Sequence, residues 1–185
     1  PDVNISEQQE LVMTGTMDYP PNVEAALWFA RGVWDFVKRE HPKLRWAIVG
    51  RRPVAALRAL AQHDPSITVT GDVPDIRPFL HRAAIVVAPI RHASGAKNKI
   101  LEALACGKAI VTSTAAIEGS PIRRNQHVLV ADSAGEWIAA ICRLLANGQE
   151  RRLFGSMARQ YAEQHAWPVI ALQYESVYQS VLANP

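Results

Sequence analysis

The sequence predicts an α/β fold in which a doubly wound parallel sheet of about six strands carries helices on both faces. Short apolar runs, suited to buried strands, alternate with segments of helical periodicity through the first two-thirds of the chain. Glycine and proline residues mark most of the changes between the two kinds of segment. This alternation favours strand–helix–strand units, which form parallel sheets with right-handed connections.

Six runs are expected to form the strands. Each is four or five residues long, and most are dominated by apolar side chains, which is the length and composition of a strand buried on both faces. In chain order the expected strands are Leu11–Thr14, Trp46–Val49, Ile67–Thr70, Ala84–Ala88, Lys108–Thr112 and His127–Ala131.

Helices are expected between and after these strands. Asn22 is expected to cap the first helix, and Pro53 to occupy the first position of the second. The polar residues 1–10 are expected to be a tether from a preceding domain, and residues 149–185 to be C-terminal helices. The expected helices are Val23 to about Val37, Pro53–Gln62, Asp75–Arg82, Lys97–Cys106, Ser133–Ala146, Gln149–His165 and Pro168–Leu182.

The composition limits the classes of protein to which the chain can belong. With 185 residues, about half of them apolar, it is long enough for one domain with a proper core. The formal charge of +3 is modest and the charges are interleaved, so a nucleic-acid partner is not expected. Cys106 and Cys142 lack metal-ligand spacing and predict buried free thiols in a reducing compartment. No run is long enough for a membrane span, and the opening proline suggests a piece of a longer protein.

The stretch from Ala84 to Thr114 predicts a strand, a glycine turn, a helix and a second strand. In a parallel sheet such a turn lies at the carboxyl edge, where ligands bind. Gly95 precedes the helix, and Lys97 and Lys99 lie in its first turn, where the helix dipole disfavours cations. An anion held by the backbone amides of the turn would offset that cost, so the sequence predicts a phosphate site.

Glu102 lies between Leu101 and Ala103 in the same apolar helix, so it is expected to be half-buried. A carboxylate in such a place needs hydrogen-bond partners. A nearby lysine, a backbone amide or the hydroxyl groups of a ligand would each supply them.

These residues resemble a known family. The pattern S-G-x-K-x-K-I-L-E-A-L-A-x-G-K-A-I-V, over residues 94–111, is similar to the donor-binding signature of family 4 glycosyltransferases, the retaining group 1 enzymes of the GT-B fold. The stretches TGTMDYPPNVEAALWF, TGDVPDIRPFL and STAAIEGS share the resemblance. It implies that residues 11–185 are a Rossmann-like, donor-binding domain, the C-terminal half of such an enzyme.

The resemblance also implies roles for individual residues. It places the diphosphate of the donor on the turn of Gly95 and Ala96, with Lys97 and Lys99 stabilising the leaving diphosphate, and the ribose on Glu102. Ser94 replaces a glutamate that contacts the transferred sugar in relatives. No residue of this half is assigned a catalytic role beyond the two lysines. The other expected donor-binding residues are Gly15, Thr16, Arg51, Val73, Pro74, Arg91, His92, Ile100 and Leu101.

The implied substrate is a UDP- or GDP-linked sugar, bound without a cofactor or a metal ion. The implied acceptor is a polysaccharide, a lipid-linked glycan or another cell-envelope glycoconjugate, held by a missing N-terminal domain. The fragment alone is therefore expected to be inactive. A cytoplasmic, bacterial location is implied, with any peripheral attachment to the inner membrane made by the missing half.

Two alternatives remain open at this stage. The chain is also compatible with half of a nucleotide-sugar epimerase, or with a non-catalytic nucleotide-binding or interaction module, which the serine at position 94 would suit.

The loop after the first strand departs from the family pattern. Asp18 and the residues after it stand where many relatives carry a basic diphosphate clamp, which shifts that task to Lys97 and Lys99. No dinucleotide-binding glycine motif, Walker motif or nucleophile elbow is present.

Overall fold

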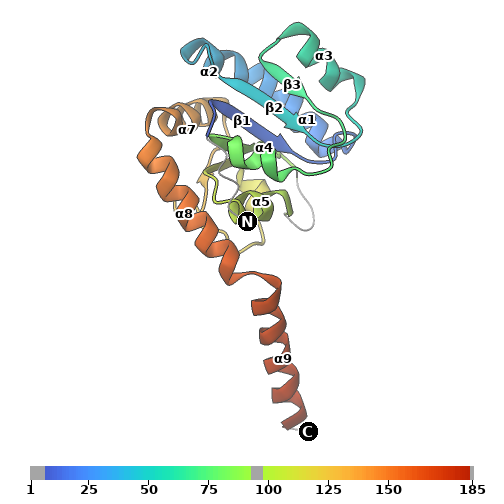
Figure 1. Cartoon of the computed structure of the whole chain (residues 1–185), viewed down its shortest axis with the longest axis vertical. Coiled ribbons are helices and arrows are strands. Elements are labelled where there is room, and N and C mark those ends of the chain that lie inside the picture. The colour runs from blue at the N-terminus through green and yellow to red at the C-terminus, as the bar shows by residue number, and fades with distance from the viewer. Residues whose placement is uncertain (1–6, 93–97, 184–185) are drawn as a thin grey trace.

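The computed structural model describes residues 7–92 and 98–183. It contains a six-stranded parallel sheet with the order β3-β2-β1-β4-β5-β6 (Figure 1). The strand order reverses direction between β1 and β4, as in doubly wound nucleotide-binding folds. The predicted fold class is therefore confirmed. The strands are β1 (Glu10–Thr14), β2 (Arg45–Val49), β3 (Ile67–Val69), β4 (Ile85–Ala88), β5 (Ile110–Thr112) and β6 (Leu129–Val130).

The strands lie where the apolar runs predict them. Every residue of β1 and β4 is buried, because helices cover both faces of the sheet. In the register, Leu11 of β1 pairs with Trp46 of β2 on one side and with Ile85 of β4 on the other. The last two strands are shorter than expected, since β5 begins only at Ile110 and β6 has two residues.

Helices form a layer on each face of the sheet (Figure 1). On one face, α7 packs against η1, α2, β4 and β5, and α3 packs against α1. On the other face, α4 contacts β1 and α5 contacts β5. The helical segments are α1 (Pro20–Phe29), the π-helical turn η1 (Ala30–Trp34), α2 (Asp35–Glu40), α3 (Ala55–His63), α4 (Arg77–Arg82), α5 (Asn98–Ala105), α6 (Thr114–Ile117), α7 (Ala134–Ala146), α8 (Gly148–Gln164) and α9 (Trp167–Ala183).

An aromatic cluster forms the centre of the core on the α1 side. Phe29 lies with its ring centroid 4.9 Å from that of Trp46 and 5.7 Å from that of Trp137, and Trp34 lies 5.7 Å from Trp46. The indole nitrogen of Trp34 donates to Asp64 at 2.7 Å, which meets the hydrogen-bonding need of that buried ring. These contacts join α1, β2 and α7, which are far apart in the sequence.

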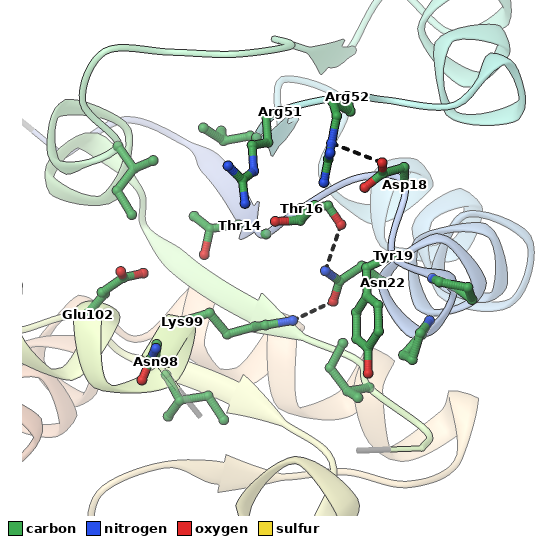
Figure 2. Close-up of a pocket in the computed structure, with 18 of the residues that line it drawn as sticks. Thr14, Thr16, Asp18, Tyr19, Asn22, Arg51, Arg52, Asn98, Lys99 and Glu102 are labelled. Carbon is green, nitrogen blue, oxygen red and sulfur yellow. Dashed lines mark hydrogen bonds and ion pairs between the residues drawn. The ribbon is translucent and has the colours of Figure 1, made fainter. Parts of the chain in front are cut away.

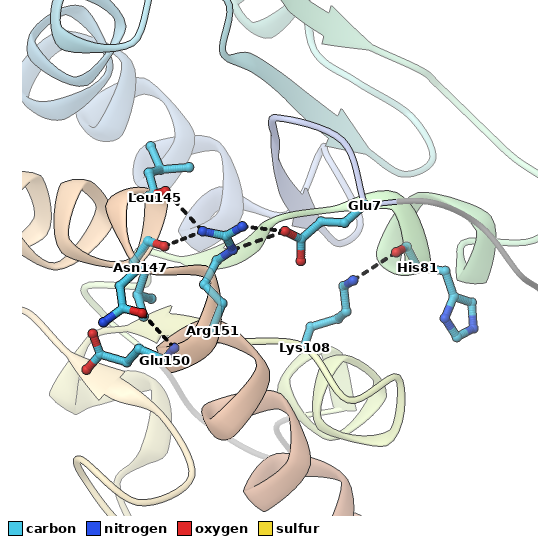
Figure 3. Close-up of polar contacts among 8 residues, drawn as sticks. Glu7, His81, Lys108, Leu145, Asn147, Glu150 and Arg151 are labelled. Carbon is cyan, nitrogen blue, oxygen red and sulfur yellow. Dashed lines mark hydrogen bonds and ion pairs between the residues drawn. The ribbon is translucent and has the colours of Figure 1, made fainter.

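Helix α8 is held near its start and near its middle. Near its start, Arg151 donates to the backbone oxygens of Leu144 and Leu145 and to the carboxylate of Glu7, so it ties the N-terminal segment to the α7–α8 turn (Figure 3). Near the middle, Gly155 lies against Gly107, which follows α5. Helix α9 then extends away from the rest of the molecule (Figure 1), and the side chains of its aromatic and aliphatic residues are largely exposed.

Several local expectations differ from the structure. Helix α1 begins at Pro20, so Asn22 is inside the first turn and is not its cap. Helix α3 begins at Ala55, after Val54, which leaves Pro53 outside it. Cys106 and Cys142 are free thiols but are only partly buried. Residues 8–10, assigned to a tether, already bond to the sheet region, since Gln8 donates to Arg82 O at 2.8 Å and Glu10 begins β1.

Candidate functional site

A cavity of about 690 Å³ opens at the carboxyl edge of the sheet. It lies beside the ends of β1 and β2 and the start of α5, next to the point where the strand order reverses. Clefts of this size at this place in a doubly wound sheet are where such folds bind ligands. The lining residues are Thr14, Gly15, Thr16, Asp18, Tyr19, Pro20, Pro21, Asn22, Val49, Gly50, Arg51, Arg52, Asp72, Val73, Ile76, Ile90, His92, Asn98, Lys99, Ile100, Glu102 and Ala116.

Two glycines bring the loops after β1 and β2 together. A Cβ on Gly50 would lie 1.7 Å from the carbonyl oxygen of Gly15, a distance that no side chain tolerates. Backbone hydrogen bonds join the same loops, from Gly15 N to Val49 O at 3.1 Å and from Met17 N to Arg51 O at 2.8 Å. One wall of the cavity is therefore a rigid pair of backbone loops.

Asn22 links this wall to α5. Its amide Nδ2 donates to the carbonyl oxygen of Thr16 at 2.9 Å, and its Oδ1 accepts a hydrogen bond from the ammonium of Lys99 (Figure 2). The asparagine is 3% exposed. It comes from α1 and the lysine from the first turn of α5, so a contact between segments 77 residues apart spans the cavity.

Two arginines follow β2, and they differ in their partners. Arg52 forms an ion pair with Asp18 at 2.9 Å, and it holds a positive φ of 56°. Arg51 has no ion pair with any residue that the structure describes, and its guanidinium projects into the same space as Thr14, Lys99 and Glu102 (Figure 2). The cavity therefore has cationic side chains on two walls, those of Arg51 and the ion-paired Arg52 on one and that of Lys99 on the other.

Glu102 lines the cavity from the second turn of α5 (Figure 2). The side chain opens onto the cleft, and the protein covers part of it. The surrounding protein still raises the pKa of its carboxyl by desolvation, and the charge of Lys99 partly opposes this. Within residues 7–92 and 98–183 no group donates a hydrogen bond to this carboxylate. Its oxygens are therefore open to the cavity.

The structure brings together most of the predicted site residues that it describes. Lining the cavity are Gly15, Thr16, Arg51, Val73, His92, Lys99, Ile100 and Glu102. Pro74, Arg91 and Leu101 are not among the lining residues, and the guanidinium of Arg91 lies over the ring of Trp28, 5.8 Å from its centroid. Ser94, Gly95, Ala96 and Lys97 lie outside the described residues.

Other lining residues were not anticipated from the sequence. Asn22 was assigned to a helix cap, and Thr14, Asp18, Tyr19, Arg52 and Asn98 were given no role in ligand binding. Asn98 lies between the two lysines of the signature, and that position was a sequence signal that it lines the site. Nothing in the sequence indicates that Asn22 pairs with Lys99. In the described part of the chain, no group of three histidine, cysteine or acidic residues is arranged to hold a metal ion.

Comparison with known families identifies the chain. Residues 8–147 match the family described as Glycosyl transferases group 1, which is more than half of the chain. The chain belongs to the group 1 glycosyltransferases. This assignment agrees with the resemblance in residues 94–111. A comparison with curated proteins found no match.

Solved glycosyltransferase structures share the fold of this group 1 domain. TarM of S. aureus matches with a TM-score of 0.77 at 15% identity, over 96% of this chain and 36% of that one. Sucrose-phosphate synthase from Thermosynechococcus elongatus matches with a TM-score of 0.74 at 20% identity, over 99% of this chain and 48% of that one. Anabaena HepE in complex with UDP matches with a TM-score of 0.70 at 15% identity, over 96% of this chain and 49% of that one. The chain thus spans half or less of the length of these proteins. In its described residues, none of the helices combines the length and apolar character needed to cross a membrane.

Proposed function

We propose that this chain is the donor-binding domain of a retaining GT-B glycosyltransferase and that the cavity holds a nucleoside diphosphate sugar, with UDP or GDP as the nucleotide. The observation that carries the proposal is the convergence of Lys99, Arg51 and Glu102 on one cavity at the switch point of the sheet, in a group 1 glycosyltransferase. The ammonium of Lys99 suits a diphosphate, and Arg51 adds positive charge to the same cavity. The carboxylate of Glu102, to which no described residue donates a hydrogen bond, suits sugar hydroxyls.

The diphosphate is placed at the first turn of α5. A helix N-terminus favours negative charge, and Lys99 adds an ammonium in the same turn. The backbone amides of Gly95 and Ala96 and the side chain of Lys97 complete this proposed anion site. Ser94 and His92 would then face the transferred sugar, while Arg51, Val73 and Pro74 flank the base.

The ribose is placed on Glu102. An ionised carboxylate accepts hydrogen bonds from two neighbouring hydroxyls at once, which is the geometry of a ribose diol. Glu102 stands one helical turn after Lys99, so a ribose would follow the diphosphate along α5. HepE was solved with UDP, and the pneumococcal O-GlcNAc transferase GtfA with UDP and GlcNAc. This supports a nucleotide-sugar donor here.

Catalysis would consist mainly of orienting the donor and stabilising the charge of the departing diphosphate, by Lys97 and Lys99. The acceptor, a cell-envelope glycoconjugate or polysaccharide, would be held by a further N-terminal domain, and the chain alone would not transfer sugar. The protein is placed in the cytoplasm, with any attachment to the inner membrane made by that further domain. Membership of a transferase family favours this reaction over an epimerase.

Isothermal titration calorimetry of the chain with UDP and GDP tests the proposal. We expect binding of one of them, and at least a fivefold weaker affinity for Glu102→Gln, since the neutral amide accepts the diol less strongly. Glu40→Gln, an exposed acid outside the cavity, is the matched control and should bind as the parent chain does. Absence of heat with both nucleotides would contradict the proposal and favour a non-catalytic module.

A further inference from the structure

Asn22 occupies an unusual position for a polar side chain in this fold. It is almost completely buried, yet it lies inside the first turn of α1 and does not cap that helix. Both halves of its amide are used, since Nδ2 donates to Thr16 O at 2.9 Å and Oδ1 accepts from Lys99 (Figure 2). A buried amide with satisfied donor and acceptor fixes the groups it joins.

The link has a consequence for the charge of Lys99. An ammonium has three N–H donors, so its bond to Asn22 is compatible with contacts to phosphate oxygens. Because Asn22 is neutral, it orients the ammonium without cancelling its charge, unlike an aspartate at the same place. Lysine side chains lose much rotamer freedom when they bind a ligand. A lysine that is already held loses less, and its affinity for the ligand rises.

Asn22 also fixes the opposite wall of the cavity. A Cβ on Gly15 would lie 2.7 Å from Nδ2 of Asn22, so the glycine allows the asparagine to reach the backbone of the β1–α1 loop. The distance between that loop and α5 is therefore bridged by one side chain. The bridge crosses the cavity next to the cation on which anion binding depends.

We propose that Asn22 is a positioning residue for the donor diphosphate: it holds the Lys99 ammonium, and with it the first turn of α5, at a fixed place relative to the β1–α1 loop. This inference rests on the proposed function, since it assigns a diphosphate to Lys99. It predicts that Asn22 acts on the charged part of the donor through Lys99 and has no effect on the base and ribose.

A double-mutant cycle tests the inference with Asn22→Ala, Lys99→Met and the pair. Affinities are measured for the tighter of UDP and GDP, and for the matching nucleoside, which lacks phosphates. We expect Asn22→Ala to lower the affinity for the nucleoside diphosphate about fivefold to tenfold, as for loss of one charge-assisted contact. The affinity for the nucleoside should be unchanged. In the Lys99→Met background, removal of Asn22 should cost almost nothing further.

Asn22→Asp gives a second test that preserves the shape of the side chain. The aspartate still accepts from Lys99 but neutralises it, so diphosphate affinity should fall further than in Asn22→Ala, with a shallower dependence on salt. Thermal unfolding and nucleoside binding verify that each variant is folded.

Three results would overturn the inference. If the single losses add in the double variant, Asn22 does not act through Lys99. If nucleoside and diphosphate weaken equally, its role is only structural. If the parent chain binds neither UDP nor GDP, the proposed function fails and this inference fails with it; the first two results leave the proposed function standing.

Discussion

Gly50 lies directly against Gly15, so that a Cβ on Gly50 would stand 1.7 Å from the Gly15 carbonyl oxygen. Gly15 directly follows β1 and Gly50 directly follows β2, and their contact sets the separation of the loops that form one wall of the cavity. The same loops are joined by the bond from Gly15 N to Val49 O. This contact leaves no room for a side chain at position 50.

Gly50→Ala should therefore destabilise the domain by about 3 kcal/mol or more, because backbone would have to move away from the new methyl group. Gly135→Ala is the control, since a Cβ there meets nothing within 4 Å and the residue lies in helix α7. It should be neutral or stabilising by up to about 1 kcal/mol. Urea unfolding of the two variants measures both effects, and equal stabilities would contradict the close approach.

A second close approach joins α8 to the end of α5. A Cβ on Gly155 would lie 2.2 Å from the carbonyl oxygen of Gly107, so Gly155→Ala should lower the free energy of unfolding by about 2 kcal/mol or more. Gly148→Ala, on the same helix, would make only ordinary contacts, the nearest at 3.5 Å, and should change stability little. Denaturant unfolding with tryptophan fluorescence distinguishes the two. A tolerated alanine at 155 would argue against this packing of α8.

Arg51 provides a test of the charge in the cavity. Arg51→Gln should lower the affinity for UDP or GDP about threefold to tenfold, a modest effect because the guanidinium is exposed to solvent. The loss should be greatest at low salt, where screening is weak. Arg45→Gln removes an exposed arginine at the opposite end of β2 and should leave affinity unchanged. Calorimetric titrations at two salt concentrations measure this, and equal effects of both variants would refute a local role for Arg51.

The pH dependence of nucleoside binding tests Glu102. Its pKa is raised above the ordinary 4.5, chiefly by desolvation, so the ionised form that accepts the ribose hydroxyls is lost as pH falls through this raised pKa. Affinity for uridine or guanosine should therefore decline on acidification at a pH above 4.5, and the decline should be absent in Glu102→Gln. A nucleoside is used because it has no phosphate that titrates in this range. A parent chain whose nucleoside affinity responds to acid no more than that of Glu102→Gln would exclude the ribose assignment.

The same raised pKa affects folding in the direction opposite to its effect on binding, since it favours the folded state at low pH. Because the folded state favours the protonated form of Glu102, the stability that this carboxyl contributes is present below its unfolded pKa and is lost as pH rises through the folded value. Glu102→Gln should thus be at least as stable as the parent chain at neutral pH. Thermal unfolding at pH 7 gives this comparison alongside the binding data.

Much of the fold follows from local pattern. The runs around Val12, Ile48 and Val86 are strands because short, mostly apolar runs suit a strand covered on both faces and are too short for a buried helix. The helix over 133–146 follows from Ser133 and Glu136, which form a reciprocal capping box. The four-residue helix α6 was not foreseen, because so short a segment carries no periodicity.

By itself the sequence determined the alternation of strands and helices and, through the signature around Lys99 and Glu102, the part of the chain that carries the candidate site. Only the tertiary structure decided which distant side chains meet there. Asn22 reads as an ordinary helix cap, and its bond to Lys99 exists because the strand order places the starts of α1 and α5 side by side at the switch point of the sheet. Such contacts depend on how separate strand–helix units pack, which local residue preferences do not encode.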